Sequence, residues 1–228
     1  MKRITMILLA LGILIAASPN TAAQLTDEMK NDGWVAIFDG TTLDGWKAND
    51  RPEDFYVEDG AIVGRGGRNH LYFMEELGNF ELKIDCKINK GGNSGVFVKS
   101  QWQENAWPTS GFELQVNNSH SDPVKTGSLY DVIKIFEAPH NDDEWFTYHI
   151  KCNRNTLEVR VNDKLLYIYE CQRSAGRRGQ GQAQEQGEAA PPITPQTRRI
   201  SQRGYIALQQ HDPGSVGMFK NIYLRKLP

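Results

Sequence analysis

The chain has 228 residues, with 26 Lys and Arg against 28 Asp and Glu, and a formal net charge of −2. This balance excludes the strongly basic surface that is typical of nucleic-acid-binding proteins. After the N-terminal segment, no stretch is apolar over the roughly 20 residues that a membrane-spanning helix needs. The length fits one domain, because β-sandwich domains reach about 200 residues without splitting.

The first 23 residues have the pattern of a secretory signal peptide. Lys2 and Arg3 form a positive segment, an apolar run covers 4–17, and small residues follow up to Ala23. The apolar run is shorter than a membrane-spanning helix, and no Cys for a lipid anchor stands near its end. We therefore expect cleavage after Ala23, export to the periplasm or the medium, and a single domain over 24–228.

The rest of the chain alternates apolar and polar residues with period 2, which predicts strands with one solvated face. A short helix is expected at 26–32. Tight turns are expected at 59–60 and 162–163, which are Asp-Gly and Asn-Asp pairs. About eleven short strands without helices between them predict an all-β fold of two packed antiparallel sheets. In chain order, the expected strands are 34–38, 55–57, 61–63, 80–88, 95–100, 111–117, 145–152, 156–161, 164–170, 204–209 and 216–226.

One segment, 173–199, breaks this pattern. It lacks aromatic residues, and Ile193 is its only large aliphatic residue. Such a composition cannot bury enough apolar surface to order itself, so we expect a flexible surface insertion between two strands. The alternative is an arm that binds a partner or a polyanion.

Three cysteines are an odd number for an exported chain. Cys86 and Cys152 follow apolar residues on the same strand faces, so both are expected in the core. One disulfide would leave one thiol, and the sequence does not choose the pair among Cys86, Cys152 and Cys171. No CxxC motif and no Cys/His metal spacing is present.

The most informative polar residues lie on the strand at 111–117. Phe112, Leu114 and Val116 would point into the core, so Glu113, Gln115 and Asn117 would line the opposite face. Amides donate and accept hydrogen bonds, and a carboxylate acts as an acid or a base, so this row suits a sugar. An ordinary solvated face is the alternative.

Three further candidates come from neighbouring strands. Lys99 would place a cation on the face of Glu113, although it could equally be a surface residue paired with a carboxylate. Gln209 and His211 stand two residues apart, where a strand gives way to a turn. Histidine is a natural acid or base near neutral pH, but a lone His is more often a hydrogen-bonding turn residue.

Loop tryptophans and one acidic run complete the candidates. Trp102 and Trp107 could stack on sugar rings or simply pack the rim of the site. Asp142-Asp143-Glu144 could bind calcium, although a solvated loop is the favoured interpretation. The sequence thus predicts no cofactor firmly, leaves calcium open, and does not indicate an oligomeric state.

Five sequence blocks recur together in a known family. They are Phe38-Asp-Gly-Thr-Thr-Leu-Asp-Gly-Trp46, Asn93-Ser-Gly-Val-Phe97, Gly111-Phe-Glu-Leu-Gln-Val116, Gly127-Ser-Leu-Tyr-Asp131 and Gly204-Tyr-Ile-Ala-Leu-Gln-Gln-His211, the last followed by Phe219-Lys-Asn-Ile222. In this order they resemble the 3-keto-disaccharide hydrolase domain family, over residues 34–227. The resemblance implies a concanavalin A-like jelly-roll sandwich whose concave face binds a carbohydrate oxidised to a ketone at C3.

The implied reaction starts from that ketone. It acidifies the proton on C2, so a base can form an enolate and the glycosidic oxygen on C1 can leave with help from an acid. Water then adds back, which gives net hydrolysis. In this scheme Glu113 and His211 share the acid and base roles, in either order. Lys99 and Gln115 stabilise the enolate oxygen, and Tyr130 and Gln209 orient the sugar.

Two alternatives to this enzyme stay open. One is a non-catalytic carbohydrate-binding module on the same fold, because fold alone does not decide function. The other is a conventional glycosidase of the endoglucanase type, which would need a second carboxylate near Glu113. The chain also departs from the family where it has Lys99 and Lys220, since the family usually has Arg at both positions, and Lys does not replace Arg in bidentate contacts.

Overall fold

The computed structural model of the chain describes residues 25–173 and 199–228. The expected signal peptide at 1–23 and nearly all of the expected insertion at 173–199 lie outside the described residues. Export and the flexibility of the insertion therefore stay predictions. No helix in the described part of the chain has the length and apolar character needed to cross a membrane.

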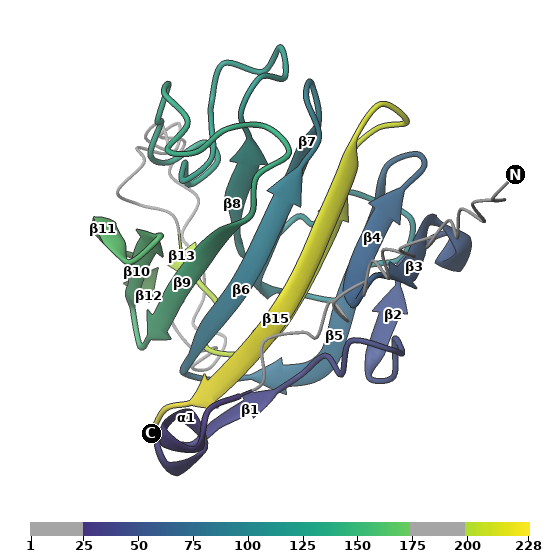
Figure 1. Cartoon of the computed structure of the whole chain (residues 1–228). Coiled ribbons are helices and arrows are strands. Elements are labelled where there is room, and N and C mark those ends of the chain that lie inside the picture. The colour runs from purple at the N-terminus through teal and green to yellow at the C-terminus, as the bar shows by residue number, and fades with distance from the viewer. Residues whose placement is uncertain (1–24, 174–198) are drawn as a thin grey trace, which may run out of the picture.

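The larger of two antiparallel sheets forms the front layer of the molecule in Figure 1. Strand β1 (Trp34–Ala36) pairs with one end of β15 (Val216–Lys226) and extends this sheet. The sheet order is β11 (Lys164–Glu170), β10 (Thr156–Val161), β9 (Phe146–Asn153), β6 (Phe80–Ile88), β15 (Val216–Lys226), β4 (Ala61–Arg65) and β3 (Phe55–Glu58).

The second sheet has five antiparallel strands and lies behind the first (Figure 1). Its order is β2 (Trp46–Ala48), β5 (Asn69–Leu77), β14 (Gly204–Gln210), β7 (Asn93–Ser100) and β8 (Phe112–Asn117). The short strands β12 (Gln172–Arg173) and β13 (Arg199–Ile200) pair in parallel beside these layers. The predicted all-β fold of two antiparallel sheets is confirmed.

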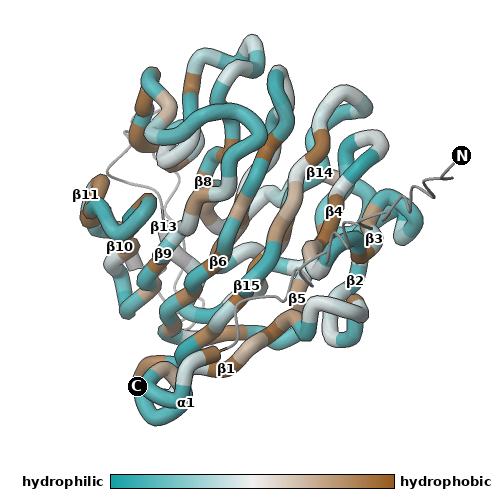
Figure 2. Tube along the Cα trace, in the orientation of Figure 1, coloured by the Kyte–Doolittle hydropathy of each residue, from teal (hydrophilic) through white to brown (hydrophobic). Residues whose placement is uncertain are grey.

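The core lies between the two sheets. Apolar and polar residues alternate along strands such as β6 (Figure 2), so one side chain in two enters the core. Leu82 and Ile84 of β6 and Val96 and Val98 of β7 are fully buried there. The cysteines Cys86, Cys152 and Cys171 are also buried, and all three are free thiols. No disulfide therefore links the sheets, and the core rests on apolar burial.

Local sequence signals specify the helix and two hairpins. Helix α1 (Asp27–Asn31) begins after Thr26, whose hydroxyl accepts a hydrogen bond from the Met29 N–H at 3.2 Å. At Asp59-Gly60 both residues have positive φ, 49° and 74°, and Asn162-Asp163 have 47° and 63°. These values are those of the two-residue turns that match the twist of paired strands. A 3-10 turn at Pro52–Asp54 was not predicted.

Strands β2 and β5 were missed by the sequence analysis. In β5 the burial pattern does not alternate, because four consecutive residues from Asn69 to Tyr72 are buried. One side of β5 faces the core, and the other lies under Trp102 and Trp107. A strand that is covered on both faces loses the period-2 signal on which the prediction depends.

A bulge changes the direction of β7 near its end. The pairing of β7 with β14 shifts register between Tyr205 and Ala207, and Lys99 has a φ of +59°. The strand that bulges therefore turns the Lys99 side chain out of the regular alternation. The backbone of Gly204 lies against this bulge so closely that a Cβ there would be 2.5 Å from the Lys99 carbonyl carbon.

This contact predicts the effect of a methyl group at Gly204. We expect Gly204→Ala to lower the free energy of unfolding by about 1–3 kcal/mol, the usual effect of overpacking a site whose neighbour is backbone. Gly78→Ala is the matched control, because its Cβ would meet only a flexible Arg203 side chain at 3.7 Å. Urea denaturation of both variants measures the difference, and equal stability of the two would contradict the packing argument.

Candidate active site

The outer face of the five-stranded sheet carries the candidate site. Directly paired residues of antiparallel strands place their side chains on the same face. In β8, Glu113 pairs with Phe97 and Gln115 pairs with Gly95, whereas Leu114 faces the core. The predicted alternation of this strand is therefore confirmed for Glu113 and Gln115, which point away from the core.

A cavity of about 350 Å³ lies over this face, within the range of small-molecule sites. It combines carboxylates, amides, an imidazole and aromatic rings, which is the chemistry that the sequence predicted for a sugar site. The cavity is lined by Asn93, Phe97, Trp107, Pro108, Glu113, Gln115, Asp122, Tyr130, Asp131, Gln209 and His211. Six of the nine predicted site residues thus meet in one place: Trp107, Glu113, Gln115, Tyr130, Gln209 and His211.

Glu113 is positioned by a glycine on the next strand. Its Oε1 accepts a hydrogen bond from the Gln209 Nε2 at 2.8 Å, although β7 lies between the strands of the two residues. Gly95 of β7 makes this contact possible, because a Cβ there would lie 2.5 Å from Glu113 Oε1. The carboxylate therefore leans across β7 toward β14.

The two glutamines of the cavity are held by their amide nitrogens. Gln115 Nε2 donates to Asn93 Oδ1 at 2.8 Å, and Gln209 Nε2 donates to Glu113. Both side chains are almost fully buried, and within the described chain neither Oε1 has a hydrogen-bond partner. A buried carbonyl oxygen without a partner is costly, so both acceptors suit the hydroxyl groups of a ligand.

His211 forms a dyad with the residue that follows it. Its Nδ1 lies 2.8 Å from Asp212 Oδ2, so with Nδ1 as the donor, Nε2 carries the free lone pair of a neutral imidazole. The Ser215 hydroxyl also donates to Asp212 Oδ2 at 2.7 Å, and the Gly214 N–H donates to Oδ1 at 2.8 Å. Burial raises the pKa of Asp212, but these hydrogen bonds outweigh it and hold the pKa below its ordinary value.

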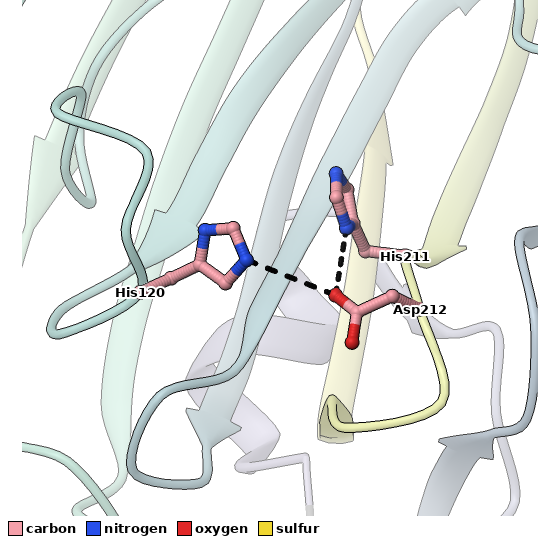
Figure 3. A group of neighbouring side chains, drawn as sticks. All are labelled: His120, His211 and Asp212. Carbon is pink, nitrogen blue, oxygen red and sulfur yellow. Dashed lines mark hydrogen bonds and ion pairs between the residues drawn. The ribbon is translucent and has the colours of Figure 1, made fainter.

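His120 approaches the same carboxylate from another loop, and Figure 3 shows its ring pointing toward Asp212. Its Nε2 lies 3.9 Å from Asp212 Oδ2, and its ring lies 5.5 Å from that of His211. His120 Nδ1 accepts a hydrogen bond from the Asp122 N–H at 3.0 Å. In the neutral ring the proton is therefore on Nε2, which faces Asp212.

These three residues could also hold a metal ion, since their ligand atoms lie within 4.8 Å of one another. Calcium prefers oxygen ligands, so two imidazoles suit a transition metal better. A metal on His120 Nε2 would require a proton on Nδ1, where the Asp122 N–H already donates. The hydrogen bonds thus favour a His–Asp–His arrangement. At Asp142-Asp143-Glu144, the predicted calcium candidate, Asp142 accepts a hydrogen bond from the Ser119 hydroxyl and Glu144 accepts one from the Asn141 amide.

The rim of the cavity is acidic and aromatic. Asp122 and Asp131 line it together with Tyr130. Burial, together with the negative charges of Asp122, Asp131 and Glu113, raises the pKa of Tyr130, so its hydroxyl keeps its proton at neutral pH. Trp107 also lines the cavity, and its ring centroid lies 5.3 Å from that of His211.

Lys99 is not part of this cavity, and the prediction that it faces Glu113 is wrong. Its ammonium group donates to the carbonyl oxygens of Gly78 and Gln202 and is almost completely buried. Burial lowers the pKa of Lys99. The bulge in β7 explains the difference, because a positive φ at Lys99 takes its side chain away from the outer face.

Two other residues that were predicted to bind the substrate also lie outside this cavity. Asn117 is fully buried, and its amide donates to the carbonyl oxygens of Asp122 and Val124. It therefore shapes the loop that carries His120 instead of lining the cavity. Trp102 lies over Tyr72, with ring centroids 5.0 Å apart, and lines a neighbouring cavity.

Neither departure from the family pattern falls in the cavity. Lys99 is buried beside Gly78, and Lys220 belongs to β15 of the other sheet, where its ammonium group lies 4.3 Å from the Trp145 ring centroid. Neither lysine therefore lines the cavity in which a substrate would lie.

Sequence reasoning missed five polar residues of this region: Asn93, His120, Asp122, Asp131 and Asp212. Asn93 is the first residue of a recognised block, just before Ser94-Gly95. Asp212 directly follows the block that ends at His211. The adjacent His211-Asp212 pair was the available signal for the dyad. His120 and Asp122 lie in a loop, where no periodicity indicates direction.

Comparison with known proteins gives a family for this arrangement. A family model described as the 3-keto-alpha-glucoside-1,2-lyase-like domain matches residues 33–225. A "3-keto-disaccharide hydrolase" of Bacteroides thetaiotaomicron is 33% identical over 172 residues, which cover 60% of this chain and 59% of that protein. The chain therefore spans less than two thirds of the length of this curated relative.

Solved structures share the fold. A Parabacteroides distasonis protein designated as a glycosyl hydrolase has 24% identity and a TM-score of 0.72, and the match covers 91% of this chain and all of that one. A Bacillus licheniformis β-glucanase has 12% identity and a TM-score of 0.54, covering 86% of this chain and 99% of that one. The jelly-roll sandwich of the lectin and glucanase type is thereby confirmed.

The position of Lys99 leads to a prediction. We expect Lys99→Met to lower the free energy of unfolding by about 1–3 kcal/mol, because two carbonyl oxygens lose their charged donor. Since Lys99 does not line the cavity, the folded variant should keep the wild-type kcat/KM on a 3-keto-glycoside, the substrate that the family resemblance implies. Thermal denaturation and a turnover assay on the same preparation test this. A large loss of kcat/KM at unchanged stability would return Lys99 to the site.

Proposed function

Because the chain belongs to the 3-keto-alpha-glucoside-1,2-lyase-like domain family, we propose that it cleaves glycosides or disaccharides whose sugar carries a ketone at C3. The observation that carries this proposal is the placement of Glu113 in one cavity with His211, whose imidazole is held by Asp212. The name of the Bacteroides thetaiotaomicron relative supports the substrate class. The amide-lined floor supports a carbohydrate ligand.

The substrate itself makes the reaction feasible. A ketone at C3 acidifies the C–H bond at C2, so a base removes that proton and the electron pair forms an enolate. The C1–O bond then breaks, the glycosidic oxygen takes a proton from an acid, and an enone remains. Water adds to C1 and a proton returns to C2, which completes a net hydrolysis. The pathway needs one base and one acid on the two faces of the C1–C2 bond.

His211 and Glu113 supply these two groups. Asp212 fixes the imidazole so that Nε2 is an acceptor, and its low pKa keeps it ionised opposite an imidazolium. Glu113 lies across the cavity, with one oxygen anchored by Gln209. We assign His211 as the base and Glu113 as the acid. The reverse assignment predicts the same loss of activity when either residue is substituted.

Tyr130 takes the role that the sequence had given to Lys99. An enolate needs a hydrogen-bond donor at its oxygen, and the raised pKa of Tyr130 keeps its hydroxyl protonated. The Oε1 atoms of Gln115 and Gln209, which have no partner among the described residues, accept hydrogen bonds from sugar hydroxyls. These contacts would orient the ring over β7 and β14.

A conventional glycosidase is the second candidate. Asp122 and Asp131 line the same cavity as Glu113, so the cavity contains the carboxylates that such an enzyme pairs. This reading predicts cleavage of unoxidised glucans, which the ketone-dependent pathway cannot cleave.

Substitution of the two proton carriers tests the proposal. We expect Glu113→Gln and His211→Asn each to lower kcat on a 3-keto-glycoside by about 10²–10⁴-fold, the usual contribution of acid–base catalysis. The assay follows release of the aglycone and the ultraviolet absorbance of the 2-hydroxy enone. Asp131→Asn is the matched control, since Asp131 is an exposed carboxylate of the same cavity.

The outcomes separate the readings. Full activity of Glu113→Gln would remove Glu113 from the mechanism. Activity on unoxidised glucan that Asp122→Asn or Asp131→Asn abolishes would favour the conventional glycosidase. Binding of glycans without turnover of any 3-keto-glycoside would favour a carbohydrate-binding module.

A further inference from the structure

The outer face of the five-stranded sheet continues past the cavity, from β14 onto β5, where it carries His70. His70 pairs directly with Gln209, so the two side chains lie on the same face. The His70 side chain is 0% exposed, and neither ring nitrogen has a hydrogen-bond partner in the described part of the chain. A buried polar group without partners is uncommon and calls for an explanation.

The chemistry of this ring suits a sugar hydroxyl. Burial, with a smaller contribution from Arg68 and His211, lowers the pKa of His70 to about 3. The ring is therefore neutral at physiological pH, with one nitrogen that donates and one that accepts. A hydroxyl group also donates and accepts, so either ring nitrogen could pair with it.

Two aromatic residues that line the cavity, Trp107 and Phe97, pack edge-on against His70, with ring centroids 5.5 and 5.2 Å from its ring. The Trp107 ring also lies 5.3 Å from that of His211. Trp107 lines the cavity and is 40% exposed. Phe97 is buried, so Trp107 is the partly exposed side chain of the two that cover His70 beside the proposed reaction centre.

The loop that carries Trp107 is anchored before the indole. The amide of Asn49 donates to the carbonyl oxygens of Gln103 and Ala106 at 3.0 and 3.1 Å, and Asn49 Oδ1 accepts from the His70 N–H at 2.9 Å. Within residues 25–173 and 199–228, the Trp107 indole makes ring contacts, one of them with the Arg68 guanidinium 5.8 Å from the ring centroid. The indole can therefore turn while the base of the loop stays beside β5.

A second cavity lies on the far side of this loop. It has a volume of about 480 Å³ and is lined by Lys47, Asn49 and Trp102 among others. Residues of this loop thus line two cavities, Trp107 the first and Trp102 the second, and His70 packs against Trp107.

We propose that His70 binds the second sugar unit of a disaccharide substrate, and that this unit displaces Trp107 to reach it. The inference rests on the proposed function, with the ketone-bearing sugar beside Glu113 and the second unit over β5. His70 is then a residue that determines specificity for disaccharides. It carries no proton in the reaction, because Glu113 and His211 already supply the acid and the base.

His70→Phe tests this assignment, because it keeps a planar ring of similar shape and removes both nitrogens. The variant should fold, since it deletes two unpaired polar atoms from a buried position. We compare its kcat/KM on 3-keto-trehalose with that on methyl 3-keto-glucoside, which has no second sugar. The loss should be about tenfold larger on the disaccharide, the effect of one hydrogen bond, and should come from a raised KM. Equal losses on the two substrates, or no loss, would overturn the proposal.

A binding measurement keeps this inference separate from the proposed function. In ¹⁵N-labelled Glu113→Gln protein, saturating 3-keto-trehalose should shift the ring nitrogen resonances of His70, whereas methyl 3-keto-glucoside should not. Wild-type protein that cleaves neither substrate would refute the proposed function. The shift of the His70 resonances would then still test whether His70 binds the disaccharide. Unshifted His70 resonances at every disaccharide concentration would refute the role of His70.

Discussion

The hydrogen bond between Gln209 and Glu113 crosses an entire strand, and the geometry of the site depends on that crossing. It exists because β7 has a glycine at the one position that lies beneath the carboxylate, where a Cβ would be 2.5 Å from Glu113 Oε1. Since β7 is paired on both edges, the separation of β8 and β14 is fixed by backbone hydrogen bonds. The carboxylate is thereby held by regular secondary structure, which positions groups better than loops do.

The other half of the site is organised differently. His211 lies just after β14, and its orientation comes from Asp212, which is itself held by Ser215 and Gly214. His120 reaches the same carboxylate from a loop whose shape depends on the buried amide of Asn117. A rigid carboxylate thus faces an imidazole on a turn, and the turn is fixed by a short network of hydrogen bonds. The two groups meet over a floor of amide oxygens that have no partners among the described residues.

The sequence predicted what strand periodicity controls. Alternation along 111–117 placed Glu113 and Gln115 on the outer face, and six of the nine expected site residues share the cavity. Prediction from the sequence failed where this periodicity breaks down. The bulge at Lys99 reverses one side chain without any change in the residue pattern, and β5 was missed because both of its faces are covered. His70 was overlooked for that reason. Only tertiary structure brings the loop residue His120 to Asp212 and places Asp122 at the cavity.

The central claim is that the ketone makes C2 acidic and that Glu113 and His211 move its proton. Turnover of a 3-keto-disaccharide in D₂O, followed by ¹H NMR of the released 3-keto sugar, tests this directly. Because the His211 side chain is partly exposed, the proton that it takes from C2 exchanges with D₂O. Elimination followed by addition of water then places one deuterium at C2, and the account predicts this incorporation during turnover. A product that forms at the full rate and retains its original C2 proton would contradict the mechanism and indicate direct displacement at C1.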